Sequence, residues 1–172
     1  MTVEAITRER RTRALAAAAL AAGAAFAQDA VPPGEKPVDP YVPSNANAAA
    51  APRADAKVFE AFHGKAGLTR IAAGLVDRSI VDPRIKDIFA TTDVPRLKRT
   101  LAEQFCFVLG GGCDYTGRDM ASVHKDMGVT DKDFNALVEN LQAAMEVEGV
   151  PFFAQNQLLA KLAPMQRKVV AR

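Results

Sequence analysis

The chain contains two histidines, and His124 is the one whose surroundings suggest chemistry. It lies between Gly110 and Thr130, in a segment that shows little helical or strand periodicity. A loop of about twenty residues is unusual in a compact domain unless something organises it. A neutral imidazole is a common ligand of metal ions, haem iron among them. His124 is therefore a candidate axial ligand, and no other residue of the chain indicates a comparable chemistry.

The other histidine, His63, precedes Gly64 at a helix junction. We expect it to be a partly exposed turn residue. No second histidine or cysteine lies near it in the sequence, so a metal site is not expected there.

The two cysteines, Cys106 and Cys113, flank the triple glycine at positions 110–112. The glycines let the chain fold back, and in an oxidising compartment a structural disulfide is the favoured outcome. In the chain-entropy model so short a loop would stabilise the fold by roughly 2.5 kcal/mol. Two buried thiols, or a redox-responsive pair beside the loop, are the alternatives. Zinc is not expected, because only two sulfurs are available and they lack the Cys-x-x-Cys spacing.

The elements that must position these residues are predicted to be helices, with no convincing strand. The folded domain is expected over residues 57–172. Short helical pieces are predicted over 57–62 and 85–89. Longer helices carry the following apolar stripes: Leu68, Ile71, Leu75 and Val76; Val94, Leu97, Leu101, Phe105 and Val108; Phe134, Leu137, Val138, Leu141 and Met145; Leu158, Leu162, Met165 and Val169. Asp82-Pro83, Gly110-Gly111-Gly112 and Gly149-Val150-Pro151 are expected to end the first three. Thr92-Asp93 and Thr130 are predicted caps, and Pro95 suits a first turn.

Several short motifs in this order resemble the group 1 truncated haemoglobins over roughly residues 58–170. The most specific part is Leu109-Gly110-Gly111 followed by Tyr115-Thr116-Gly117 and then by His124. Supporting motifs at matching spacings are Asp82-Pro83-Arg84, Ile88-Phe89, Arg96-Leu97-Lys98 and Gly149-Val150-Pro151. The resemblance implies an all-α truncated globin, a two-over-two helical sandwich around haem b.

The resemblance also implies roles for individual residues. His124 matches the proximal haem-iron ligand, and Phe89 matches a residue that packs on the haem face. The remaining cofactor-binding residues expected are Val76, Leu97, Lys98, Leu101, Tyr115 and Met120. Lys98, Arg99, Arg118 and Lys125 are candidates for pairing with the haem propionates, although most charges on such helices are simply solvated.

The chain departs from the family on the side of the haem where gases bind. Many relatives carry a tyrosine and often a glutamine there, whereas the matching positions hold Val76, Leu97 and Leu101. Gln104, one turn further along, could face the pocket or solvent, and Tyr41 and Tyr115 are not placed to donate. Because bound O2 is retained by hydrogen-bond donors, an apolar pocket predicts weak O2 retention and favours CO and NO.

Residues 1–56 are expected to lie outside the folded domain. Arginines between Arg8 and Arg13, an apolar run over 14–27 and Ala25-Phe26-Ala27 are typical of a secretory signal peptide over 1–27. An uncleaved alanine-rich helix is the alternative. Six prolines in residues 28–56 predict an extended, mobile linker. We therefore expect an exported, periplasmic protein without stable membrane insertion after cleavage.

Composition narrows the function further. Of 22 basic and 20 acidic residues, residues 1–27 hold four arginines and two glutamates, so the remainder is neutral. A neutral body offers no electrostatic footprint for nucleic acid. The leading hypothesis is binding of a diatomic gas (O2, NO or CO), for O2 transport or NO handling, with an unidentified reductant. NO dioxygenase activity is an open alternative, as are a b-haem electron-transfer or redox-sensing protein and a helical interaction module without haem.

Overall fold

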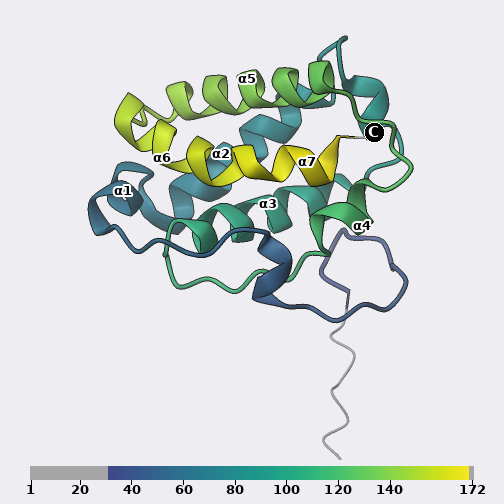
Figure 1. The fold of residues 1–172 in the computed structure, drawn as a ribbon, viewed down its shortest axis with the longest axis horizontal. Helices are drawn as coiled ribbons and strands as arrows, with labels where there is room; N and C mark the ends of the chain where they lie inside the picture. Colours follow the sequence, from purple (N-terminus) through teal and green to yellow (C-terminus); the bar gives the residue numbers. More distant parts are fainter. Residues whose placement is uncertain (1–30, 171–172) are drawn as a thin grey trace, which may run out of the picture. The chain divides into compact units, whose positions relative to one another are not determined.

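The computed structural model describes residues 31–170, and every regular element in that range is helical (Figure 1). The predicted signal peptide, residues 1–27, lies outside the described residues. Within residues 31–170, each helix is too short or too polar to cross a lipid bilayer. The prediction of an all-α fold is confirmed for this part of the chain.

Four longer helical segments form two antiparallel pairs (Figure 1). One pair is α2 (Gly64–Ser79) with α3 (Val94–Val108). The other is α5 (Asp131–Val147) with α6 (Phe152–Leu162), which continues through η3 (Ala163–Met165) and α7 (Gln166–Val169). Helix α2 contacts both α3 and α5, so it joins the two pairs. This is the two-over-two arrangement that the family resemblance implied.

Local sequence signals set the ends of these helices. Asp93 caps α3 by accepting a hydrogen bond from the Arg96 amide, and Pro95 occupies the first turn. Thr130 and Asp133 form a capping box at the start of α5. Gly110 follows α3 with φ +75°, and a Cβ there would lie 2.6 Å from Cα of Ala54. Glycine is therefore required at position 110 both for its backbone conformation and for the close approach.

Two clusters of buried apolar residues hold the domain together. The larger lies between the helix pairs and includes Phe62, Leu68, Ile71, Phe105 and Leu158, each no more than 1% exposed. The smaller cluster, of Ala48, Tyr115, Met120, Val129, Met165 and Val169, lies beside the larger one. It brings residues from both ends of the described chain to the segment that carries His124.

The segment between α3 and α5 contains a short helix that periodicity did not reveal. Helix α4 (Met120–His124) begins at Asp119, whose carboxylate accepts hydrogen bonds from the amides of Ala121 and Ser122. Five residues are too few to show a repeat in the sequence, so only the cap signal was available. The helix ends at His124, so the backbone from which this side chain projects is held in a regular helical turn.

Cys106 near the end of α3 and Cys113 form a disulfide, with the two Cα atoms 5.7 Å apart. The structure thus has the structural disulfide that the sequence favoured. Because Cys113 opens the segment 113–119, the bond ties that segment to α3 just before the chain enters α4.

Residues 31–55 differ from the mobile linker that the prolines led us to expect. This stretch packs on the helical domain and includes η1 (Asn45–Ala48), where Ala48 is fully buried. Its amides and carbonyls find partners there, because the amide of Arg53 donates to Val108 and Ala48 accepts from Gln104. Prolines exclude a long helix from this stretch, but they do not prevent an extended chain from packing. The short helices α1 (Ala56–Ala61) and η2 (Lys86–Phe89) complete the fold.

Candidate functional site

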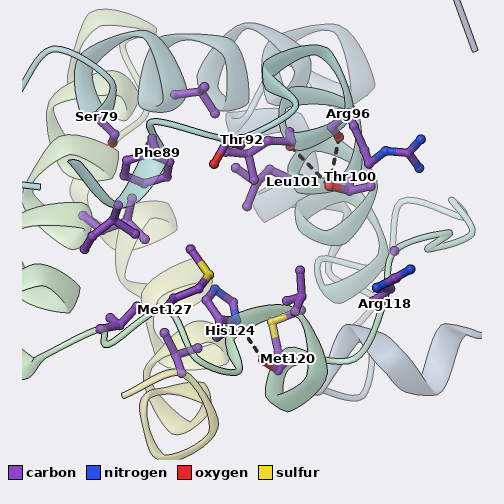
Figure 2. A pocket seen from close by; sticks show the side chains of 18 of the residues that line it. Ser79, Phe89, Thr92, Arg96, Thr100, Leu101, Arg118, Met120, His124 and Met127 are labelled. Carbon is purple, nitrogen blue, oxygen red and sulfur yellow. Dashed lines mark hydrogen bonds between the residues drawn. The ribbon is translucent and has the colours of Figure 1, made fainter. Parts of the chain in front are cut away.

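A cavity of about 350 Å³ lies between the two apolar clusters. Its wall comes from α2, η2, α3, α4 and α5, from the segment 113–119 and from residues 31–49. Most of the lining is apolar, which suits a largely hydrophobic ligand. Figure 2 shows the side chains around its open centre, with His124 on one side and Phe89, Thr92 and Leu101 on the other.

His124 points into the cavity with one ring nitrogen free of partners among the described residues (Figure 2). Its Nδ1 lies 2.8 Å from the carbonyl oxygen of Met120, four residues earlier in α4. A carbonyl can only accept, so Nδ1 holds the proton and Nε2 keeps its lone pair. Burial lowers the pKa of the imidazole below its ordinary value of 6.5. His124 is therefore neutral at pH 7 and has the tautomer suited to binding a metal through Nε2.

The side of the cavity opposite His124 is almost without hydrogen-bond donors. Val76 is 1% exposed and lines it, as do Leu97 and Leu101. Ser79 also lines the cavity, but its hydroxyl donates to the carbonyl of Leu75 at 2.8 Å. Thr92 and Thr100 also line the cavity. The Thr100 hydroxyl donates to the carbonyls of Arg96 and Leu97, whereas the Thr92 hydroxyl makes no hydrogen bond within the described part of the chain.

Gln104 faces inward, which the sequence left open, but its amide nitrogen is turned away from a ligand. Nε2 donates to the carbonyl of Ala48 at 3.1 Å and lies 3.7 Å from the sulfur of Met120 and 3.6 Å from that of Met165. The side chain is 4% exposed, so these partners satisfy a buried donor. Gln104 joins η1 to the cavity wall and does not supply a donor opposite His124.

Two arginines, Arg96 and Arg118, lie at one end of the cavity (Figure 2). Arg96 is paired with Glu35 at 3.4 Å and with Asp93 at 3.4 Å. Arg118 donates to the carbonyl oxygen of Asp39 at 2.7 Å, and its guanidinium carbon lies 5.1 Å from the centre of the Tyr41 ring. The charge of Arg96 is thus compensated by carboxylates, whereas Arg118 pairs with none within residues 31–170.

The structure brings most of the predicted site residues together. Those that line the cavity are Val76, Phe89, Leu97, Leu101, Tyr115, Met120 and His124. Lys98 does not line it, and its ammonium pairs with Asp77 at 2.6 Å. Of the other predicted propionate partners, Arg118 lines the cavity, but Arg99 and Lys125 do not. Helical geometry explains the difference, because Lys98 lies on another face of α3 from Leu97 and Leu101.

Sequence reasoning missed several lining residues. Arg96 and Thr100 lie on α3 beside predicted wall residues, so their positions could have been read from the same helical wheel. Thr92 precedes the helix, and helical spacing does not place it. Met127, which lies beside His124, follows the end of α4 by three residues. Val38 and Tyr41 carried no signal at all, because they belong to the stretch expected to be a linker.

The donor set fits haem better than a metal ion held by protein ligands alone. Haem iron takes four donors from the porphyrin and needs one axial imidazole from the protein. His124 is an imidazole of the suitable tautomer inside an apolar cavity, so it is the residue that could hold a haem there. In the described residues no group of three or more histidines, cysteines, aspartates or glutamates could hold a metal ion.

Residues 57–171 match the family model for bacterial-like globins. The chain belongs to this family. The match covers the helices from α1 onward. It leaves out the segment before residue 57, which also contributes to the cavity wall. Globins bind gases at a haem, so membership supports haem-based gas binding in general.

Curated relatives narrow the resemblance to one group of globins. A group 1 truncated haemoglobin of Mycolicibacterium paratuberculosis is 28% identical over 114 residues, covering 66% of this chain and 84% of the relative. One from Tetrahymena thermophila is 30% identical over 93 residues, covering 54% and 77%. The chain is therefore similar to group 1 truncated haemoglobins, as its motifs suggested.

Solved structures show the same fold. The truncated haemoglobin of Tetrahymena pyriformis superposes with a TM-score of 0.63 at 23% identity, covering 67% of this chain and 98% of that one. The 2/2 haemoglobin of Synechococcus sp. PCC 7002, determined with covalently attached haem, gives 0.62 at 22% identity, with the same coverage. Both confirm the truncated globin fold for the described domain.

Proposed function

We propose that the protein binds haem b, with Nε2 of His124 as the axial iron ligand, and that the haem binds a diatomic gas. The observation that carries the proposal is the state of His124 in its cavity. The ring is neutral, its tautomer is set by the carbonyl of Met120, and its free nitrogen faces an apolar space of about 350 Å³. A histidine with a purely structural role is expected to have a hydrogen-bond partner at each buried ring nitrogen, whereas Nε2 of His124 faces an apolar space.

The other lining residues have roles that follow from their positions. Phe89 and Leu101 lie across the cavity from His124, where they would pack against the flat apolar ring. Arg118 brings a positive charge to one end, where a haem carboxylate would leave the apolar region. Bound haem supplies an iron that binds O2, NO or CO, and the chain supplies the ligand, the slot and the exclusion of water.

The mainly apolar wall opposite His124 favours gases that need no hydrogen bond. Val76, Leu97 and Leu101 supply no donor to a gas that gains negative charge on binding. We therefore expect fast release of O2, with NO or CO held more firmly. Handling of NO, or exchange of electrons with an unidentified reductant, suits such a pocket better than storage of O2.

Export to the periplasm is part of the proposal. It rests on the charge and apolar pattern of residues 1–27 and agrees with the disulfide between Cys106 and Cys113, a bond that persists in oxidising compartments. N-terminal sequencing of the protein from a periplasmic fraction tests it. A mature chain starting at residue 28 supports export, and a cytoplasmic chain that keeps residues 1–27 contradicts it.

Absorption spectroscopy of the haem-reconstituted chain tests the central proposal. We expect a Soret band and a five-coordinate ferrous haem that takes up CO and NO. Ferrous haem that is already six-coordinate without added ligand would instead favour the electron-transfer reading. A chain that binds no haem would leave only a helical interaction module.

A further inference from the structure

The segment 31–49 does more than cover the domain, because two of its side chains line the cavity. Val38 and Tyr41 stand in the wall together with residues of α2, α3 and α4. The family match begins at residue 57, so these two side chains lie outside the region shared with other globins. The cavity of this chain is completed by residues that the family pattern does not contain.

A buried carboxylate fastens this segment to α3. The side chain of Glu35 is only 3% exposed, and its two oxygens face Arg96 and Arg99. Arg99 donates through Nη2 to Oε2 of Glu35 at 3.0 Å and through Nη1 to Glu103 at 2.7 Å. A second tie joins the same elements, because the guanidinium of Arg96 donates to the carbonyl of Lys36 at 2.6 Å. Charge-assisted hydrogen bonds at low exposure are among the stronger polar contacts in proteins.

Residues 41–47 of this segment form hydrogen bonds with residues 115–117, which lead into α4. The hydroxyl of Tyr41 donates to the carbonyl of Thr116 at 2.6 Å. Asn47 donates to the carbonyl of Gly117 at 3.2 Å, and Asn45 accepts from the amide of Tyr115 at 2.7 Å. The segment 113–119 is thereby held between α3, through the disulfide, and residues 41–47.

Arg118 is the cavity residue that the segment 31–49 contacts most directly. Its guanidinium is placed by the carbonyl of Asp39 and by the face of the Tyr41 ring, both from the segment 31–49. Neither partner neutralises its charge. Arg96, the other arginine at this end, already has its charge compensated by Glu35 and Asp93. The two arginines therefore have different tasks: Arg96 fastens the segment, and Arg118 keeps a charge for a ligand.

We infer that the segment 31–49 is a structural part of the haem-binding site. Glu35 keeps it closed over one end of the cavity, while Asp39 and Tyr41 position Arg118 for a haem carboxylate. This inference rests on the proposed function, since it concerns how the haem is retained. It assigns Glu35 and Tyr41 as positioning residues.

Haem transfer from the full chain to an excess of an acceptor apoglobin tests this inference, with the rate followed by the shift of the Soret band. Opening the closure should speed haem loss, so we expect Glu35→Gln to raise the rate by about tenfold, the effect of losing a charge-assisted bond. Glu148→Gln is the matched control. Glu148 also pairs with an arginine, Arg70 at 2.9 Å, but neither lines the cavity. We expect no change in its rate.

A second pair of variants separates positioning from general stability. Tyr41→Leu should speed haem loss, and Tyr41→Phe, which keeps the ring beside Arg118, should restore most of the slow rate. In the Arg118→Gln background the effect of Tyr41→Leu should shrink, because the two residues act through one contact. Circular dichroism checks that each variant folds. Hydrogen exchange in the apoprotein, which needs no haem, should show faster exchange within 31–49 for Glu35→Gln.

The outcomes distinguish the two proposals. A chain without a Soret band overturns the proposed function and this inference with it. A chain that binds haem but loses it equally fast in wild type, Glu35→Gln and Tyr41→Leu overturns the inference alone. Faster loss in those variants, with Glu148→Gln unchanged, supports it.

Discussion

Replacement of Leu101 by glutamine is the most direct test of the dry wall opposite His124. Leu101 lies across the cavity from His124 on α3, and glutamine has nearly the same volume but carries an amide donor (Figure 2). The substitution therefore adds one hydrogen bond to a bound gas without filling the cavity further. Leu101→Met, which conserves volume and adds no donor, is the matched control.

The size of the effect follows from the kind of hydrogen bond formed. A bond to a group that carries charge contributes about 1.5 to 3 kcal/mol. Each 1.4 kcal/mol is tenfold in an equilibrium constant, so O2 release should slow by about 10- to 150-fold in Leu101→Gln. Release of CO, which gains little charge, should change far less. The selective slowing of O2 is the signature of a donor, since a change in cavity shape would affect both gases.

Stopped-flow replacement of O2 by CO in the ferrous protein measures these rates. We expect fast O2 release in wild type and Leu101→Met, and slow release in Leu101→Gln. Slow release already in wild type would refute the reasoning, because a donor would then be present. Thr92 is the side chain to suspect in that case, and Thr92→Val, which removes the hydroxyl at constant shape, would identify it.

Three further predictions concern the iron ligand, the disulfide and the acid range. Changing His124 to alanine should abolish stable haem retention, measured by the Soret band after gel filtration, while the same change at His63 should not; retained haem would sink the axial assignment. Replacing Cys106 and Cys113 together by alanine should lower the free energy of unfolding by about 2.5 kcal/mol in urea titrations, and an unchanged midpoint would contradict the chain-entropy argument. Hydrogen bonding from Arg99 lowers the pKa of the Glu35 carboxyl below its ordinary value of 4.5. The contribution of the ionised Glu35 carboxylate to the free energy of unfolding is therefore complete above about pH 4.5 and is lost as the pH falls through the lowered pKa. Glu35→Gln should flatten the stability loss between pH 7 and pH 3, and an equally steep loss would argue against this role.

The helical frame could be predicted because its signals are local. Asp93 and Thr130 cap their helices, and the apolar stripes repeat at helical spacing over fifteen or more residues. Val76, Leu97 and Leu101 could be placed for the same reason, because they belong to predicted apolar stripes. The other predicted residues that line the cavity, Phe89, Tyr115, Met120 and His124, were expected from the family resemblance. Lys98 shows the limit of this approach, because a family motif places it in the sequence but the helix turns its side chain toward Asp77.

The segment 31–49 could not be predicted because its signals are neither local nor apolar. Its prolines describe what the backbone cannot form, which is a long helix. What holds it are contacts across more than fifty residues of sequence, such as Glu35 with Arg99 and Tyr41 with the carbonyl of Thr116. Carbonyl partners leave no trace in the side-chain sequence. A proline-rich stretch before a small domain therefore needs a structure before it can be described as a linker.

The polar contacts around the cavity are concentrated on the side of His124 and at the arginine end, while the opposite wall is mainly apolar. Under the proposed function, retention of the haem and choice of the gas therefore depend on different parts of the chain. Glu35 and Leu101 share no partner among the described contacts. The effects of Glu35→Gln and Leu101→Gln on the activation free energy of O2 release should therefore add. If the double variant instead released O2 at a rate that neither single change explains, the segment 31–49 would be acting on the gas as well as on the haem. Additivity would show that the residues outside the shared globin region hold the cofactor and leave its ligand chemistry to α2 and α3.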